Sequence, residues 1–509
     1  MKHLPLLSLL IAVPAAGAAA VLALPAARVH AVRRVAAVAA LLPVAIAALL
    51  WFAFEPRGAQ WQFTQQVSLA ASSGLRYAVG IDGLGLMLAA LTSIVAAVAI
   101  VGGHAEPGKT WPAALLLMEA GALGAFVSLD VMQMFVFWQI AIAALVVMSA
   151  ASETRRITAV SSAIAIAGGV LMVVGLLTLH ASYQALASVS TFDIRAYHIA
   201  SLPRPAQSRV FLLLALAFTA PLALVLLQLA TDLNRRSSWL LALVTLAVVV
   251  KLGAFGFLRL LMPVVPEVSR AVAPAFVLVG LVSAAIAACV TVRAPSRLAL
   301  YLVGIGQLAL ATAGMFAATP AALTGGLVHL FAQGIAMAAL FAIYFSGDDG
   351  RRASTVLSPG WIAAAAIVGG VTGTRLIAAG LLPFGRTTVA ASVLANILTA
   401  LALIVAVRRS SIGSAAGNSQ PRTASLSIAP LIVLLVALAV YPSPLLARLE
   451  TSVARVVMRI SPEYSSQVAD CLNQPVPPPP TDSGLPAGMM LAAPCADGSN
   501  TPAEPAKKP

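Results

Sequence analysis

The sequence predicts an all-α polytopic membrane protein with about 14 transmembrane helices. Three observations support this prediction: 60% of the 509 residues are hydrophobic, only 9% are charged, and apolar stretches of about 20 residues recur along the chain. This composition excludes a water-soluble globular enzyme, a disordered chain and a nucleic-acid-binding protein. The net charge of +14 reflects scarce acidic residues rather than a basic patch.

The apolar stretches are joined by short connections that contain turn-forming residues, such as Glu106-Pro107-Gly108. About 20 apolar residues in a helix cross the hydrocarbon core of a bilayer, so each stretch is long enough to span it. The stretches cover approximately residues 4–24, 35–54, 79–103, 111–129, 131–151, 157–180, 209–231, 238–262, 268–292, 297–318, 321–346, 360–382, 386–407 and 425–447.

The first stretch fits either a membrane helix or a cleaved signal peptide, because Lys2 and His3 precede it and small residues follow at 16–20. Orientation follows from the distribution of basic residues. Connections after odd-numbered stretches hold 15 Lys and Arg residues, against nine on the other side up to residue 447, where the last stretch ends. Since basic connections stay in the cytoplasm, both termini are predicted to be periplasmic.

Residues 460–509 form a tail of different composition. Its 11 prolines, four of them consecutive at 477–480, predict an extended and poorly ordered segment. Cys289 lies within a stretch, where it is expected to pack as a small apolar residue. Cys471 and Cys495 lie in the tail on the predicted periplasmic side, where they can either form a disulfide or stay free.

Few ionisable residues interrupt the apolar stretches. Each costs roughly 2.5–3.5 kcal/mol to insert, so each is a candidate functional residue. Lys251 lies near the middle of the eighth stretch, too deep to reach the interface easily. It suits a proton relay within the bilayer, and the alternative is a structural lysine held by backbone carbonyls. The candidates singled out are Asp82, Glu119, Asp130, Lys251, His329 and Arg375.

Glu119 and His329 have two readings each. Glu119 can belong to a proton path by pairing with a cation on a neighbouring helix, or it can be structural. His329 and Gln333 are four residues apart and therefore share a helix face. They can form a hydrogen-bonded chain, or His329 can be a packing histidine.

Two stretches carry features that predict a broken helix. Pro221 removes a backbone donor from the seventh, and Gly373 beside Arg375 weakens the twelfth. Breaks at corresponding places of two halves are typical of inverted-repeat transporters. Stretches 4–8 and 9–13 are therefore predicted to be two inverted five-helix repeats. The predicted organisation is helices 1–3 in residues 1–103, repeats in 104–262 and 263–410, helix 14 and its flank in 411–459, and the tail.

Several motifs resemble those of a known family. Residues 80–86 (GIDGLGL) resemble the family's GIDGLSL, and residues 251–259 (KLGAFGFLR) are similar to its KLGAYGLLR. Further matches lie at 119–121, 128–130, 135–138, 297–301 and 338–341. The motifs resemble the antiporter-like membrane subunits of respiratory complex I (NADH–quinone oxidoreductase), of the subunit M type, a family shared with cation/proton antiporters. The resemblance covers about residues 78–410.

This resemblance implies a proton-translocating membrane-arm subunit of a bacterial inner membrane, packed beside homologous antiporter-like subunits. NADH, FMN, iron–sulfur clusters and quinone would be bound by partner subunits. The sequence itself contains no phosphate-binding glycine loop, metal-ligand cluster or soluble domain, so this chain is predicted to hold no cofactor and no redox active site.

The chain departs from the family at the positions that handle protons. Gln139 stands where the family has a glutamate, and Thr219 stands where it has a lysine two residues before proline. His329 and Gln333 occur in exchanged order, and no acidic residue accompanies Arg375.

The family's glutamate–lysine pair switches between paired and separated states, and neither Gln139 nor Thr219 can ionise to replace it. Lys251 is the one member of the central charged set that clearly remains. The sequence therefore predicts attenuated proton translocation or a structural role. The alternative is the membrane subunit of a cation/proton antiporter, a membrane hydrogenase or an inorganic-carbon uptake system.

Overall fold

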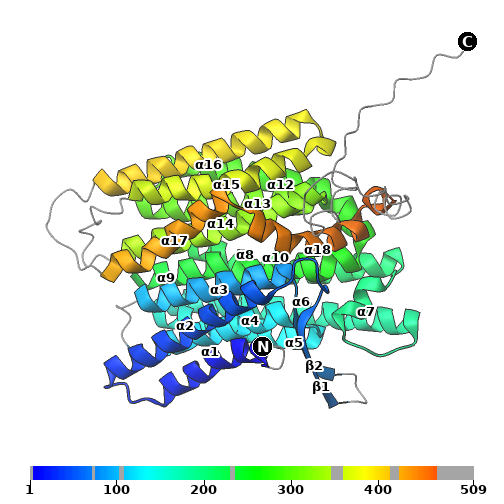
Figure 1. Ribbon diagram of the computed structural model, residues 1–509, viewed down its shortest axis with the longest axis horizontal. Coiled ribbons are helices and arrows are strands. Elements are labelled where there is room, and N and C mark those ends of the chain that lie inside the picture. Colours follow the sequence, from blue (N-terminus) through cyan, green and yellow to red (C-terminus); the bar gives the residue numbers. More distant parts are fainter. Residues whose placement is uncertain are drawn as a thin grey trace, which may run out of the picture.

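The computed structural model describes residues 4–70, 75–102, 108–229, 236–345, 359–412 and 423–466. Long helices run side by side through the molecule in similar directions (Figure 1). The predicted all-α membrane fold is confirmed. The first half contains α1 (Leu6–Ala23), α2 (Val29–Ala53), β1 (Gln62–Ala70), β2 (Leu75–Ile81), α3 (Gly83–Gly102), α4 (Thr110–Val127), α5 (Val131–Ser152), α6 (Arg155–Ala187), α7 (Ile194–Ile199) and α8 (Arg204–Leu229).

The second half begins with an irregular helix. Its segments are α9 (Arg236–Val244), η1 (Thr245–Val249), α10 (Val250–Gly256), η2 (Phe257–Leu261) and α11 (Met262–Val264). It continues with α12 (Pro266–Thr291), α13 (Ser296–Phe316), α14 (Pro320–Phe345), α15 (Pro359–Gly380), η4 (Leu382–Phe384), α16 (Arg386–Ile412), α17 (Thr423–Val440) and α18 (Ser443–Ile460).

A helix occupies each predicted apolar stretch. Within the described residues, 12 helices are long and apolar enough to cross a membrane, and the α17–α18 pair, bent by 70°, would make a thirteenth. The 22-residue helix α15 occupies the place of the predicted twelfth stretch. The chain is a multi-pass membrane protein, and the figure of 14 crossings stays a prediction.

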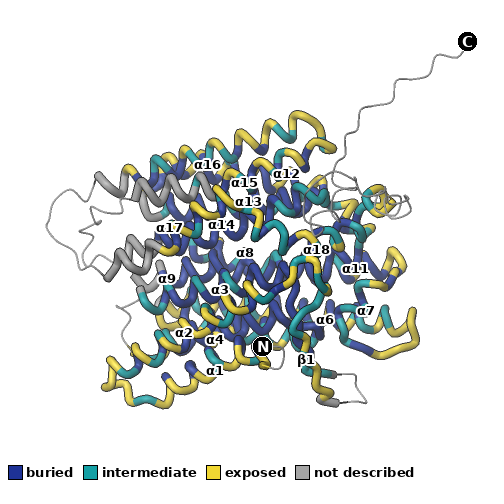
Figure 2. The backbone as a smooth tube through the Cα atoms, in the orientation of Figure 1, coloured by how far each residue is buried: buried dark blue, intermediate teal, exposed yellow. Residues whose placement is uncertain are grey.

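The buried centre is built around the irregular helix and α14. Nearly all residues of Leu240–Val264 and Pro320–Leu340 are buried, whereas helices such as α6, α12 and α16 expose large apolar side chains (Figure 2). Such a surface suits lipid or partner helices. Cys289 lies on the exposed surface of the span α12, among the apolar side chains that this helix presents outwards.

The helices of each predicted repeat pack against one another. In the first set α4 packs on α5 and α6 on α8, and in the second α12 packs on α13 and α14 on α15. Small residues permit these approaches: a Cβ added to Gly121 would lie 2.5 Å from the backbone nitrogen of Ala141. The division into repeats and domains stays a prediction.

The two predicted helix breaks do not appear in the backbone. The helix α8 continues without interruption through Pro221, and α15 continues through Gly373 and Arg375. A single missing donor does not end a helix whose remaining backbone groups can be satisfied only within the helix. Gly373 instead permits close packing, because an added Cβ would lie 2.9 Å from the carbonyl oxygen of Gly325 on α14.

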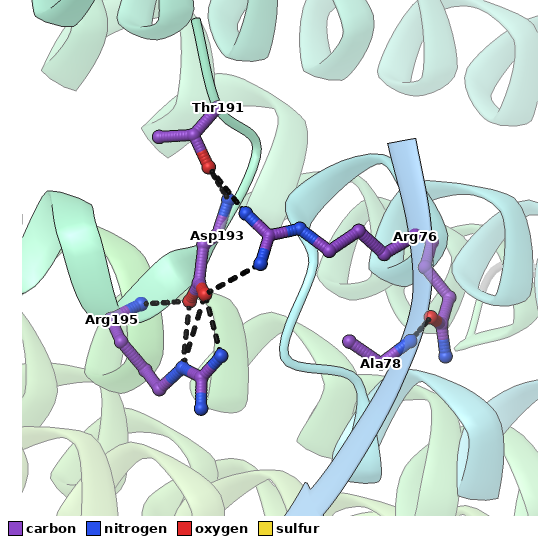
Figure 3. A network of polar contacts seen from close by, with 6 residues as sticks. Arg76, Ala78, Thr191, Asp193 and Arg195 are labelled. Atoms are coloured by element: carbon purple, nitrogen blue, oxygen red, sulfur yellow. Dashed lines mark hydrogen bonds and ion pairs between the residues drawn. The ribbon is translucent and has the colours of Figure 1, made fainter. Parts of the chain in front are cut away.

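An antiparallel β-hairpin, β1–β2, stands beside the helices (Figure 1), and the sequence analysis does not predict it. The Ala78 amide donates to the Gln133 side chain on α5 over 2.7 Å, and Arg76 donates to Thr191 over 3.2 Å. Asp193 accepts from the Arg195 backbone at 2.9 Å and forms a 2.6 Å ion pair with its guanidinium (Figure 3). These contacts tie the hairpin to α5 and α7.

Candidate functional site

Lys251 lies in the most irregular part of the helical core. It belongs to the short helix α10, which is preceded by the π-helical segment η1 and followed by a second, η2. Its side chain is buried, with 1% of the residue exposed. Since π-helical turns are rare and are found frequently at functional sites, this segment is the first candidate site.

The ammonium of Lys251 is held by neutral oxygen atoms. Its Nζ donates to the Leu246 carbonyl over 2.8 Å and makes a short hydrogen bond to Oε1 of Gln333 on α14. The Gln333 amide in turn donates to the Gly304 carbonyl on α13 over 3.4 Å. Among the described residues no carboxylate lies within 4.0 Å of this ammonium. Lys251 therefore connects three helices without forming an ion pair.

His329 extends this polar row along α14. Both of its ring nitrogens are buried and have no hydrogen-bond partner among the described residues. A cavity of about 30 Å³ borders His329 and Gln333, and is also lined by Gln307, Gly370 and Asn396. A volume of this size holds a water molecule where polar groups can bind it. The structure thus joins Lys251 to Gln333 and places His329 on the same cavity as Gln333, whereas the sequence predicted only that His329 and Gln333 share a helix face.

Glu119 lies on α4, fully buried, and neither carboxyl oxygen has a hydrogen-bond partner within the described parts of the chain. Burying a carboxyl group without a hydrogen-bond partner costs free energy, and buried polar groups are nearly always paired. The unpaired Glu119 carboxyl is therefore a candidate functional group. The structure gives no ion pair between Glu119 and Lys251, so the predicted pairing with a neighbouring cation is not formed in this state.

The remaining predicted residues lie apart from Lys251. Gln139 on α5 packs against Gly169 of α6, where an added Cβ would lie 2.3 Å from its amide nitrogen. The hydroxyl of Thr219 donates to the Leu216 carbonyl of its own helix over 2.9 Å. Arg375 is exposed on α15. None of the three contributes a charge to the surroundings of the ammonium.

A buried ion pair lies near one end of the irregular helix, and the sequence analysis did not predict it. The guanidinium of Arg259 on η2 donates to both carboxyl oxygens of Asp82, over 2.9 and 2.6 Å. Asp82 also accepts from the Ser452 hydroxyl at 2.9 Å and from the Gly85 amide at 2.9 Å. Both members of the pair stand in family-like motifs, but nothing in either motif indicates its partner.

Asp130, another ionisable residue singled out from the sequence, has a local structural role. Its side chain caps α5 by accepting from the Met132 and Gln133 amides over 2.9 and 3.1 Å. Within the described residues no group of three His, Cys, Asp or Glu side chains is placed to hold a metal ion. Cys471 and Cys495 lie outside the described residues.

Comparisons with known proteins bear on this arrangement of residues. Residues 128–357 match the family model described as "NADH:quinone oxidoreductase/Mrp antiporter, TM". This range includes Lys251, His329 and Gln333, so the buried polar row lies within the matched part of the chain.

Curated relatives agree with this assignment over more of the chain. The chain is 24% identical to "NADH-quinone oxidoreductase subunit M" of Mycobacterium tuberculosis, over 90% of this chain and 95% of that protein. It is 22% identical to "NADH-ubiquinone oxidoreductase chain 4" of Prototheca wickerhamii, over 66% of this chain and 68% of that protein. The resemblance to antiporter-like subunits of the subunit M type is confirmed.

Solved structures share the fold of the antiporter-like chain. A chain of respiratory complex I from Thermus thermophilus with bound NADH matches with a TM-score of 0.71 and 21% identity, covering 88% of this chain and 99% of that one. A chain of the Mrp complex from Dietzia matches with a TM-score of 0.70 and 17% identity, covering 91% and 98%. At such low identity these likenesses concern the fold alone.

Proposed function

We propose that the chain is a membrane-arm, antiporter-like subunit of a complex I-type NADH–quinone oxidoreductase. The full-length likeness to proteins named subunit M supports this assembly. In it, homologous antiporter-like subunits would lie beside this chain, and partner subunits would bind NADH, FMN, iron–sulfur clusters and quinone. The membrane would be the bacterial inner membrane, with both termini in the periplasm.

The surroundings of Lys251 support a further part of the proposal, that proton translocation through this subunit is attenuated. A charge-pair switch needs a carboxylate that approaches and leaves the ammonium, since the electrostatic work comes from their changing separation. Here Lys251 is bound by a carbonyl and an amide oxygen, both uncharged. Gln139 and Thr219 supply no ionisable partner. The subunit keeps a buried polar row and lacks the pair that would drive protons along it.

The test is the ratio of protons moved to electrons transferred by the reconstituted assembly. Lys251→Met retains the length of the side chain and removes its charge, so it should leave this ratio near the wild-type value. Lys109→Met is a matched control, because Lys109 precedes α4 and, among the described residues, bonds only to the Leu22 and Leu24 carbonyls. Assembly and electron transfer are measured in the same vesicles.

A fall in the ratio with Lys251→Met but not with Lys109→Met, at normal electron transfer, would show that Lys251 still carries protons. Attenuation would then be wrong, while the assignment to a complex I-type assembly would stand. Failure of the chain to co-purify with redox subunits would instead contradict that assignment.

The likeness to the Mrp chain favours one alternative, a subunit of a cation/proton antiporter without redox partners. That match covers as much of both chains as the complex I match, at nearly the same TM-score. The subunits that co-purify with the chain from its own membrane distinguish the two proposals, because only the first predicts NADH-oxidising activity in the purified assembly.

A further inference from the structure

A pocket of about 380 Å³ opens beside the Asp82–Arg259 pair, away from Lys251. Five parts of the chain line it: the segment just before β1, the junction of β2 and α3, the short helix α7, the segment η2 with the residues that follow, and α18. None of its lining residues belongs to the polar row of Lys251, Gln333 and His329.

The pocket carries more positive than negative charge. Four arginines line it, Arg195, Arg259, Arg455 and Arg459, against a single carboxylate, Asp82. The carboxylate is already engaged by Arg259 and by Ser452. Arg195 is neutralised by Asp193, which lies outside the lining, so the excess positive charge of the pocket is carried by Arg455 and Arg459.

Two of these arginines have free hydrogen-bonding capacity. The Nε of Arg259 is buried and has no hydrogen-bond partner among the described residues, although its guanidinium stacks 4.4 Å from the centre of the Trp61 ring. Arg455 is exposed and makes no hydrogen bond or ion pair with the described part of the chain. A buried donor without an acceptor is costly, so an unpaired Arg259 Nε indicates that an acceptor is missing.

The walls of the pocket and its position indicate what kind of anion fits. Beside the arginines the lining is apolar, with Leu84, Leu258 and Val456, and Ile199 at the rim is 78% exposed. The helix α18 is amphipathic and turns 70° away from α17, so it lies across the direction of the membrane helices (Figure 1). Helices of this kind lie in the interface between lipid headgroups and acyl chains.

We propose that this pocket binds the headgroup of an anionic phospholipid. Its phosphate would accept hydrogen bonds from Arg455 and from the free Nε of Arg259, and its glycerol and acyl parts would contact the apolar wall that ends at Ile199. A soluble anion would use the arginines but not the apolar wall, and for this reason the structure favours lipid. The bound lipid would fasten α18 to α7 and η2 at the membrane surface.

Native mass spectrometry of the full chain in detergent tests the proposal, with phosphatidylglycerol and phosphatidylcholine of identical acyl chains as probes. The wild-type chain should retain phosphatidylglycerol in preference to phosphatidylcholine. Arg455→Gln should weaken retention of phosphatidylglycerol about fivefold, the effect expected of one arginine near an anionic lipid. The variant should fold, because Arg455 has no hydrogen-bond or ion-pair partner to lose within the part of the chain that the structure describes.

Arg270→Gln is the matched control. Arg270 is exposed in the first turns of α12, which begins three residues after the pocket residue Pro263, but it does not line the pocket. Equal retention of the two lipids, or equal losses in the Arg455 and Arg270 variants, would overturn the proposal. A third arm adds millimolar inorganic phosphate: displacement of phosphatidylglycerol by phosphate alone would assign the pocket to a soluble anion and reject the lipid.

Discussion

At the scale of single residues, the Asp82–Arg259 pair shows how a buried charge depends on its partner. Both side chains are almost completely buried, and the two residues are 177 positions apart in the sequence. The Coulomb attraction and four hydrogen bonds to the carboxylate offset the cost of removing both charges from water. Either residue alone would leave an uncompensated charge.

We therefore expect Asp82→Ala to destabilise the chain by about 3–5 kcal/mol, the usual cost of breaking a buried pair by removing one partner. The double substitution Asp82→Ala with Arg259→Met should recover part of that loss, since no charge remains buried. Thermal unfolding in detergent measures both effects. A double variant less stable than Asp82→Ala alone would show that the pair is not the main interaction of Arg259.

The sequence predicted Lys251 as the central residue but could not predict its ligands. A lysine in an apolar stretch stands out because its insertion cost is a property of the residue and its depth. The irregular course of the helix brings the Leu246 carbonyl to the Lys251 ammonium. The packing of α14 on this segment brings the Gln333 side chain to it. The spacing of His329 and Gln333 indicated a shared face without indicating what that face contacts.

At the scale of elements, irregular backbone occurs where no local residue pattern indicates it. Proline and glycine predicted breaks at Pro221 and Gly373, whereas the π-helical segments occur at Thr245–Val249 and Phe257–Leu261. These segments contain neither residue. Between the two π-helical segments, α10 packs closely on α8: a Cβ added to Gly253 of α10 would lie 2.4 Å from the Phe218 carbonyl oxygen of α8. Such contacts between helices are not encoded in local propensity.

The short helix α7 gives an element-scale prediction of pH dependence. His198 donates from Nε2 to the Arg259 carbonyl over 2.7 Å, which holds α7 against η2. Burial lowers the pKa of His198 from its usual 6.5 to about 4. Between these values the unfolded chain takes up a proton that the folded chain resists, so stability is complete above pH 6.5 and falls as the pH drops towards 4.

The unfolding temperature of the wild-type chain should therefore fall more between pH 6.5 and 4 than that of His198→Gln. Carboxyl groups that titrate in the same pH range are present in both proteins, so their contribution drops out of the difference between the two unfolding temperatures. His30→Gln, which changes an exposed histidine at the start of α2, should keep the wild-type pH dependence. Identical pH profiles for the wild type and His198→Gln would contradict this assignment.

At the scale of the whole molecule, α18 returns to the start of α3 from the far end of the described chain. Asp82 and Ser452, joined by a hydrogen bond, are 370 residues apart. A Cβ added to Gly83 would lie 1.7 Å from the carbonyl oxygen of Arg448, which is backbone and cannot move aside cheaply. Glycine at this position permits the closure between the two ends.

Gly83→Ala should displace α18 and cost about 1–3 kcal/mol, as overpacking of a close contact does. Faster hydrogen exchange in α18, together with a lower unfolding temperature, checks the expectation. Gly306→Ala is the control, because its nearest neighbour would be the Ala287 methyl at 3.3 Å, so its effect should be smaller. Unchanged exchange in α18 of the Gly83 variant would mean that the closure tolerates a side chain.

Sequence alone predicts the membrane-embedded, helical class and the approximate positions of the helices, and it marks Lys251 as a candidate residue. These follow from hydrophobicity and from the cost of inserting a charge, both of which act residue by residue. The folded arrangement of distant segments sets that Lys251 is held by neutral oxygens, that Asp82 pairs with Arg259, and that α7, η2 and α18 line a basic pocket. Each of these joins segments distant in sequence, and packing, not local composition, sets which side chains meet.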